Sequence, residues 1–263
     1  AEGNRGRRMG EVGAVATLGT VLGTGFVWLF FDEVSPQYRL GFLCAAGMGA
    51  VTAIVYALMH IPHLHQPRPR LVVRRKYGLY YLLEALFGAR KQIFITFGFW
   101  VLIDVYGQPP SGIAQLLFVG AVIGIAFKPL VGLAIDRFGE RHVMMVDGGV
   151  LAVVCIGYGY AMRITPDPAS ALLLARICFV VDNLLFALGT GRAVYLSRIT
   201  DSPQDLNSTL AMGVSINHVA SMLLPIAAGM IWEAFGYERV FLLAAFLALG
   251  VSAASALVPP RRA

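Results

Sequence analysis

The chain has 263 residues, of which 57% are hydrophobic and only 14% are charged, and its mean hydropathy is +0.70. A soluble domain carries roughly 25% charged residues, so this composition excludes an ordinary water-soluble domain. The net charge of +6 fits either nucleic-acid binding or the excess of positive charge on the cytoplasmic loops of membrane proteins. The three cysteines, Cys44, Cys155 and Cys178, lie in apolar segments without metal-ligand spacing, and no disulfide is predicted.

Eight apolar segments are each long enough, at about 20 residues, to cross a membrane as a helix. They occupy residues 12–31, 40–61, 78–105, 112–134, 143–163, 169–191, 207–232 and 239–258. The breaks between them contain residues that end helices for steric reasons, such as Pro166-Asp167-Pro168 and Ser202-Pro203. The sequence therefore predicts an all-α integral membrane protein with eight transmembrane helices.

Lysine and arginine are distributed unequally between the two alternating sets of loops. Of the 21 basic residues, fourteen lie in one set, three lie in the other set, and four lie within the spans. The richer set comprises residues 1–11, 62–77, 135–142, 192–206 and 259–263. Because positive charge marks cytoplasmic loops, both ends of the chain and the loop 62–77 are expected in the cytoplasm. This bias explains the basic charge without nucleic acid as a partner and leaves the lipid bilayer as the expected surrounding.

A sequence motif occupies the loop between the fourth and fifth spans. It reads Gly132-Leu133-Ala134-Ile135-Asp136-Arg137-Phe138-Gly139-Glu140-Arg141. This loop resembles the G-x-x-x-D-R-x-G-R-R signature of the major facilitator superfamily, with Glu140 where the family usually has arginine. In the family the signature lies between the second and third helices of each six-helix half, as it does here within the last six spans.

The resemblance implies a fold, a domain division and a gate. Residues 1–61 would be the last two helices of the N-terminal half, 62–77 the central cytoplasmic loop, and 78–263 the six-helix C-terminal half, with helices one to four absent. The gating motif would consist of Gly132, Asp136, Arg137, Gly139 and Arg141. Asp136 would meet the N-terminus of the first span at residues 11–13. Two further stretches, 88–94 and 215–218, resemble a bacterial branch of the superfamily, which implies a bacterial cytoplasmic (inner) membrane.

Polar residues near the middle of the spans are candidates for a substrate or ion pathway. Ionisable groups in hydrocarbon cost roughly 2.5–3.5 kcal/mol each on insertion scales, so they usually face a cavity or a partner. The candidates come from three spans, and the helical rise brings them toward one depth: Arg90, Lys91, Gln92, Asp182, Asn183, Asn217 and His218. We expect them to converge on one central cavity.

Structural readings of these residues remain open. Arg90 and Lys91 either line a cavity, extend their charged ends to the membrane surface, or form a purely structural ion pair, and Asp182 is a candidate partner for one of them. His218 is either a proton or substrate contact or a histidine satisfied by a hydrogen bond between helices. Interfacial or structural roles are assigned to four residues nearer the span ends: Glu84, Asp104, Lys128 and Asp147.

The function that follows is secondary transport of a small molecule by alternating access, with proton coupling as a further expectation. The excess of cations favours a polar or anionic substrate. The alternative is a truncated or half-size membrane subunit with an assembly or scaffold role. The sequence contains no P-loop or nucleophile elbow, so we do not expect an enzyme. His60, His63 and His65 form a cluster, but Pro62 breaks its helical register and no carboxylate or cysteine lies nearby; no metal or other cofactor is predicted.

Overall fold

The computed structural model describes residues 5–31, 37–59 and 73–260, and in the first helix it describes the side chains from residue 16 onward. These residues form helices joined by short turns, without a strand among them. In chain order the elements are α1 Arg5–Phe30, α2 Tyr38–Leu58, η2 Arg75–Tyr77, α3 Gly78–Ile93, η3 Phe94–Gly98, α4 Phe99–Asp104, α5 Pro110–Gly159, α6 Ala161–Ile164, α7 Pro168–Leu185, η4 Phe186–Gly189, α8 Thr190–Ile199, α9 Pro203–Phe235 and α10 Tyr237–Ala256.

Six helical stretches in the described part of the chain are long and apolar enough to cross a membrane. They are Tyr38–Leu58, Arg75–Asp104, Pro110–Gly159, Pro168–Ile199, Pro203–Phe235 and Tyr237–Ala256. The stretch Pro110–Gly159 combines two predicted spans, because its backbone leaves the helical conformation at Gly139 (φ 80°, ψ 154°). α1 supplies the first predicted span, although its described apolar part, Ala16–Phe30, is shorter. The predicted all-α membrane fold is confirmed, and its eight spans correspond to these stretches.

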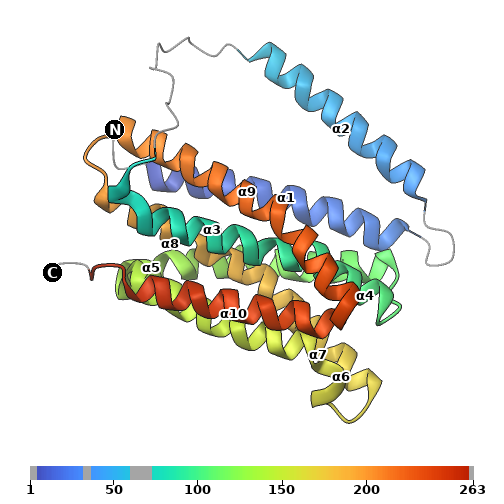
Figure 1. The fold of residues 1–263 in the computed structure, drawn as a ribbon. Helices are drawn as coiled ribbons and strands as arrows, with labels where there is room; N and C mark the ends of the chain where they lie inside the picture. The colour runs from blue at the N-terminus through green and yellow to red at the C-terminus, as the bar shows by residue number, and fades with distance from the viewer. Residues whose placement is uncertain (1–4, 32–36, 60–72, 261–263) are drawn as a thin grey trace.

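The helices form a bundle with α5 at its centre. α10, α7 and α1 all pack against α5, and α9 packs along α3 (Figure 1). α2 lies apart from this bundle and has no buried residue (Figure 1). The core is therefore built from the elements after residue 73, with α1 attached to it through α5.

Local sequence explains where two of the long helices begin. Asp167 caps α7, because its Oδ1 accepts hydrogen bonds of 3.0 Å from the backbone N–H groups of Ala169 and Ser170. The side-chain hydrogen bond from Ser170 is also the main reason why the pKa of Asp167 is lowered. Ser202 caps α9 in the same way, and a proline follows each cap at the first helical position. The breaks predicted at these two sites are confirmed.

The sixth predicted span ends later than expected. The sequence placed its end at residue 191, whereas η4 and α8 continue the helical path to Ile199. Arg192, which the charge count assigned to a cytoplasmic loop, therefore lies within a helix and is buried. The physical reason is an acidic partner on α3, because the Nε of Arg192 lies 2.9 Å from Oε1 of Glu84.

Loops that the sequence assigned to the same side meet at the same end of the bundle. At one end the turn of α5 contacts the end of α8, through an ion pair of 2.7 Å between Glu140 and Arg198. At the opposite end Arg163, in α6, pairs at 2.6 Å with Glu238 at the start of α10. The alternation of loops expected from eight spans is thus present in the structure.

Glycine allows a close approach between α5 and α10. A Cβ atom at Gly148 would lie 2.6 Å from the carbonyl oxygen of Ala248 and 2.6 Å from the backbone nitrogen of Ser252. Small residues permit such contacts between the backbones of membrane helices, where van der Waals packing drives association. The neighbouring Gly149 has no atom within 4 Å of the equivalent position.

We expect Gly148→Ala to lower the free energy of unfolding by roughly 1–3 kcal/mol, because the new methyl group forces α5 and α10 apart. Gly149→Ala is the matched control, since it makes the same change in open space and should be neutral or stabilising by up to about 1 kcal/mol. Thermal unfolding of the purified protein in detergent measures both. Equal effects of the two substitutions would contradict the close contact.

Candidate substrate pathway

A buried arginine on α3 lies between two carboxylates from other helices. The Nη1 atom of Arg90 is 3.1 Å from Oδ1 of Asp182 on α7, and its Nη2 atom is 3.6 Å from Oδ1 of Asp147 on α5. The rings of Phe87 and Phe186 each lie 5.2 Å from the guanidinium carbon. The Arg90 side chain is only 1% exposed. The predicted pairing of Asp182 with one of the cations of α3 is therefore observed.

A second ion pair lies one to two turns away on α3. Glu84 pairs with Arg192, whose guanidinium carbon lies 3.4 Å from the centre of the Phe87 ring. Glu84 also accepts a hydrogen bond of 3.1 Å from the side-chain amide of Asn217 on α9. The Oδ1 atom of Asn217 accepts a bond of 3.1 Å from Nζ of Lys91. Glu84 thus belongs to the interior, whereas its position in the sequence would also have allowed it to reach the interface.

These contacts form two neighbouring groups, which share the Phe87 ring through Arg90 and Arg192, and together they are called the buried charge network. We use this name for three cations and three acids together with Asn217: Arg90, Lys91, Arg192, Glu84, Asp147 and Asp182. When all six are ionised, their charges cancel. Because unpaired charge is strongly disfavoured in hydrocarbon, this balance allows the network to exist at membrane depth. Asp147, expected as a structural partner near the cytoplasmic loop, is one of its members.

A cavity of about 500 Å³ lies on another side of α7, between α7, α5 and α1. Polar groups and aromatic rings share its wall. Its lining residues are Thr17, Thr20, Ile95, Phe99, Gly120, Ala121, Gly124, Phe127, Lys128, Asn183, Leu184, Phe186 and Ala187. The Nζ atom of Lys128 donates a hydrogen bond of 2.9 Å to Oγ1 of Thr17, which joins α5 to α1 at the cavity. This volume suits a small-molecule ligand.

The seven predicted pathway residues are divided between the network, the cavity and the surface. Arg90, Lys91, Asp182 and Asn217 belong to the buried charge network, and Asn183 lines the cavity. The structure does not bring the other two into either group. Gln92 donates a hydrogen bond of 3.0 Å to the Thr96 hydroxyl of its own helical path, and His218 is exposed on α9.

Helix geometry explains this division. Successive residues of an α-helix point about 100° apart, and on α7 this offset turns Asp182 toward Arg90 while Asn183 lines the cavity. The predicted pathway residues therefore do not share one cavity, although they lie at similar depths along their helices. Lys128 was assigned to the interface, yet it lines the cavity. One feature of the sequence could have indicated a functional position for Lys128. It directly precedes Pro129, and this proline removes a helical hydrogen bond inside a long apolar segment.

The motif loop forms the sharp turn within α5. Gly139 has a positive φ of 80°, a conformation that glycine adopts readily, which explains this glycine of the motif. Asp136, Arg137 and Arg141 surround a small pocket of about 200 Å³ that also touches Pro260. Gly132 lies one helical turn before Asp136, with open space beside it. The predicted meeting of Asp136 with residues 11–13 involves side chains that lie outside the described ones.

The residue that departs from the family signature is buried and paired. Glu140 is 1% exposed, and its Oε1 lies 2.7 Å from Nε of Arg198 on α8. Arg198 also donates hydrogen bonds of 2.7 Å and 3.3 Å to the carbonyl oxygens of Pro259 and Pro260. The acidic substitution in the motif thus joins the α5 turn, the end of α8 and the segment after α10.

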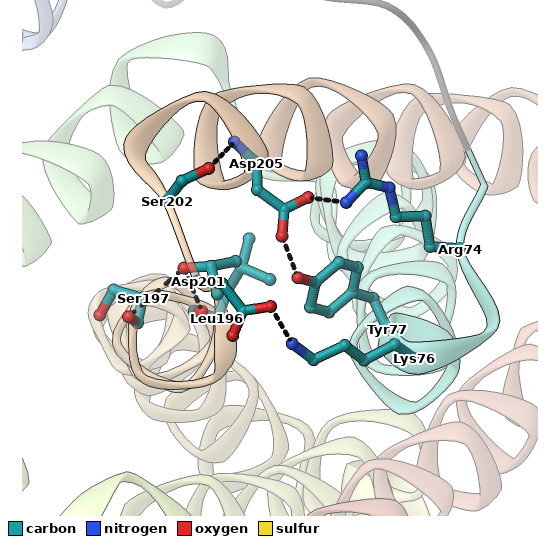
Figure 2. A network of polar contacts seen from close by, with 9 residues as sticks. Arg74, Lys76, Tyr77, Leu196, Ser197, Asp201, Ser202 and Asp205 are labelled. Carbon is teal, nitrogen blue, oxygen red and sulfur yellow. Dashed lines mark hydrogen bonds and ion pairs between the residues drawn. The ribbon is translucent and has the colours of Figure 1, made fainter.

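The same end of the bundle carries a second polar cluster (Figure 2). Asp205, in the first turn of α9, lies 2.7 Å from Nη1 of Arg74 and accepts a hydrogen bond from the Tyr77 hydroxyl. Lys76 pairs with Asp201 at 2.6 Å. As Figure 2 shows, these contacts attach the segment before α3 to the connection between α8 and α9.

Metal binding receives no support from the described residues. Within 5–31, 37–59 and 73–260, no group of three or more His, Cys, Asp and Glu side chains is placed to hold an ion. The histidine cluster at positions 60, 63 and 65 lies outside these ranges.

The fold and the two polar regions define a class of protein. A bundle of membrane-crossing helices with a neutralised charge network and a polar cavity at membrane depth is typical of helical membrane transporters. The family model described as Major Facilitator Superfamily matches residues 1–214 of this chain. The chain therefore belongs to the major facilitator superfamily, and it is a membrane transporter protein of that family. The comparison with curated proteins finds no match.

The Glu140–Arg198 pair gives a prediction with an unusual order of effects. Glu140→Gln should lower the free energy of unfolding by on the order of 2 kcal/mol, because Arg198 loses its charged partner. Glu140→Arg should be more harmful although it restores the residue usual in the family, because two cations then face each other. Thermal unfolding in detergent tests this order, with Glu233→Gln on exposed α9 surface as the control. A Glu140→Arg variant as stable as the parent would contradict the pairing.

Proposed function

We propose that this chain contributes to secondary transport of a small molecule by alternating access. The observation that carries this proposal is the cavity between α1, α5 and α7. Polar side chains line part of this cavity, although they lie on apolar helices that could cross a membrane without them. Family membership supports transport in general. One wall of the cavity comes from α1, which precedes α2 and the loop 62–77, and the other comes from helices after that loop. Movement of α1 against the six-helix unit would open the cavity to one face of the membrane and then to the other.

We also infer how the chain divides into working parts. Residues 1–61 with α1 and α2 form one part, 62–77 the connecting cytoplasmic loop, and 78–263 the six-helix part. The polar clusters of Arg198 and Asp205 support this division, since both lie within the six-helix part or at its start. They would keep that part rigid while α1 moves.

A cysteine placed in the cavity tests alternating access directly. Ala121 lines the cavity, whereas Val153 is 70% exposed on the other arm of α5 and is absent from the cavity wall. In a background without the native cysteines, Ala121→Cys in membrane vesicles should react with a membrane-impermeant maleimide added from either face. Val153→Cys, expected to face lipid, should react from neither. Labelling of Ala121→Cys from one face only, at every condition tried, would contradict alternating access.

Proton coupling is the finer part of the proposal, and the buried charge network supports it. Arg90 faces two carboxylates, so protonation of Asp182 would leave it the more distant Asp147 as ionised partner. Arg192 lies close enough to add to the positive field at Asp147. Such a change of partner would shift α7 relative to α5. Because α7 also carries the cavity residue Asn183, this shift would change the shape of the cavity.

We expect the ratio of Ala121→Cys labelling from the two faces to depend on pH and to lose that dependence with Asp182→Asn. The asparagine side chain can still accept a hydrogen bond from Arg90, but it cannot gain or lose a proton. Asp167→Asn, which removes a carboxylate from the loop before α7, is the matched control and should keep the dependence. An unchanged pH profile in Asp182→Asn would remove this residue from the proton pathway.

An assembly or scaffold role is the second candidate, and one observation favours it. α2 is an apolar helix with no buried residue, so all of its faces are available to lipid or to other helices. The labelling experiment separates the two roles, because a scaffold has no need of a cavity that opens alternately to both faces.

A further inference from the structure

Lys128 is the one cation among the cavity-lining residues, and it forms no ion pair with any acidic side chain that the structure describes. Its ammonium group donates to the hydroxyl of Thr17 at 2.9 Å. A hydroxyl can accept this hydrogen bond but cannot neutralise the charge. By contrast, Arg90 and Arg192 each face a carboxylate within the buried charge network.

Lys128 lies within a membrane-crossing stretch, Pro110–Gly159. It precedes the end of its predicted span at residue 134 by six residues, which corresponds to about 9 Å along the helix at 1.5 Å per residue. This is about a third of a ~30 Å hydrocarbon core. An unneutralised charge at this depth is disfavoured in hydrocarbon. A ligand with a negative charge would relieve this penalty at the cavity.

The rest of the cavity wall limits what else the ligand can be. Asn183 and Thr20 supply a few hydrogen-bonding groups, while Phe99, Phe127 and Phe186 supply aromatic surface. A single cation matches a single negative charge, and the apolar rings favour an apolar or aromatic body.

We propose that the cavity binds an organic anion, with Lys128 holding its carboxylate and the phenylalanine rings holding its apolar body. This inference rests on the proposed transport function, because it names the substrate class for the same cavity. The carboxylate would take the place of the Thr17 hydroxyl at Nζ of Lys128. Since Thr17 lies on α1, binding of the anion would replace one hydrogen bond between α1 and α5.

Three probes that differ only in their head group test the proposal. They are 3-phenylpropionate, 3-phenylpropanol and 3-phenylpropylamine, which are anionic, neutral and cationic at neutral pH. Each is added to the full chain carrying Ala121→Cys, and the slowing of maleimide labelling is measured. We expect the concentration for half-protection to be about tenfold lower for 3-phenylpropionate than for the alcohol, the size of effect that one charge-assisted hydrogen bond gives. The amine should protect least.

Variants at position 128 identify the residue responsible. Lys128→Met should abolish the tenfold preference, and Lys128→Arg should keep it because the positive charge remains. Arg163→Gln, which removes an exposed cation paired with Glu238 outside the cavity, should leave the preference unchanged. Size-exclusion chromatography confirms that each variant is folded.

Failure of this inference can be distinguished from failure of the proposed function. Labelling of Ala121→Cys from both faces, with equal protection by the three probes, would overturn the anion assignment and leave transport standing. A preference for the anion that survives in Lys128→Met would overturn the role of Lys128. Absence of labelling from one face would count against alternating access whatever the probes do.

Discussion

The need to neutralise charge inside a membrane governs the arrangement of this bundle. Three cations and three acids on α3, α5, α7 and α8 lie close enough to cancel one another, and Asn217 on α9 connects two of them. Removing one partner would leave an uncompensated charge in a low-dielectric interior, a defect that is strongly destabilising. The network therefore fixes how five helices face one another, and the apolar contacts are arranged around it.

The cavity differs from the network in one respect that matters for function. Within the network Arg90 and Arg192 each face a carboxylate and Lys91 contacts the amide oxygen of Asn217, whereas at the cavity Lys128 contacts only a hydroxyl among the described polar groups. A network without net charge is expected in a stable core, whereas a cation without an acidic partner is expected at a site that binds an anion reversibly. α7 contributes to both regions through the adjacent residues Asp182 and Asn183, so a single peptide unit connects the two regions.

At the turn around Gly139, the charge of one motif residue differs from the family signature while the conformation of the turn is retained. Glycine supplies the positive φ that the turn requires, and this part of the signature is retained. Glu140 replaces a cation usual in the family, and Arg198 on α8 provides the matching charge. A single acidic residue thus converts a basic loop into a contact between the turn, α8 and the segment after α10.

The membrane class, the helical breaks and the family follow from the sequence alone. These features depend on local properties: apolar length, caps such as Asp167 and Ser202, and a contiguous motif. Which polar residues face one another depends on the tertiary structure. The charge pattern predicts a loop position for Arg192, and the packing places it beside Glu84; the position of Lys128 in its span predicts the interface, and the packing places it across the cavity from α1. Depth along a helix can be calculated from residue number, but the partner of a side chain depends on how distant helices pack, and that packing is not encoded in any one segment.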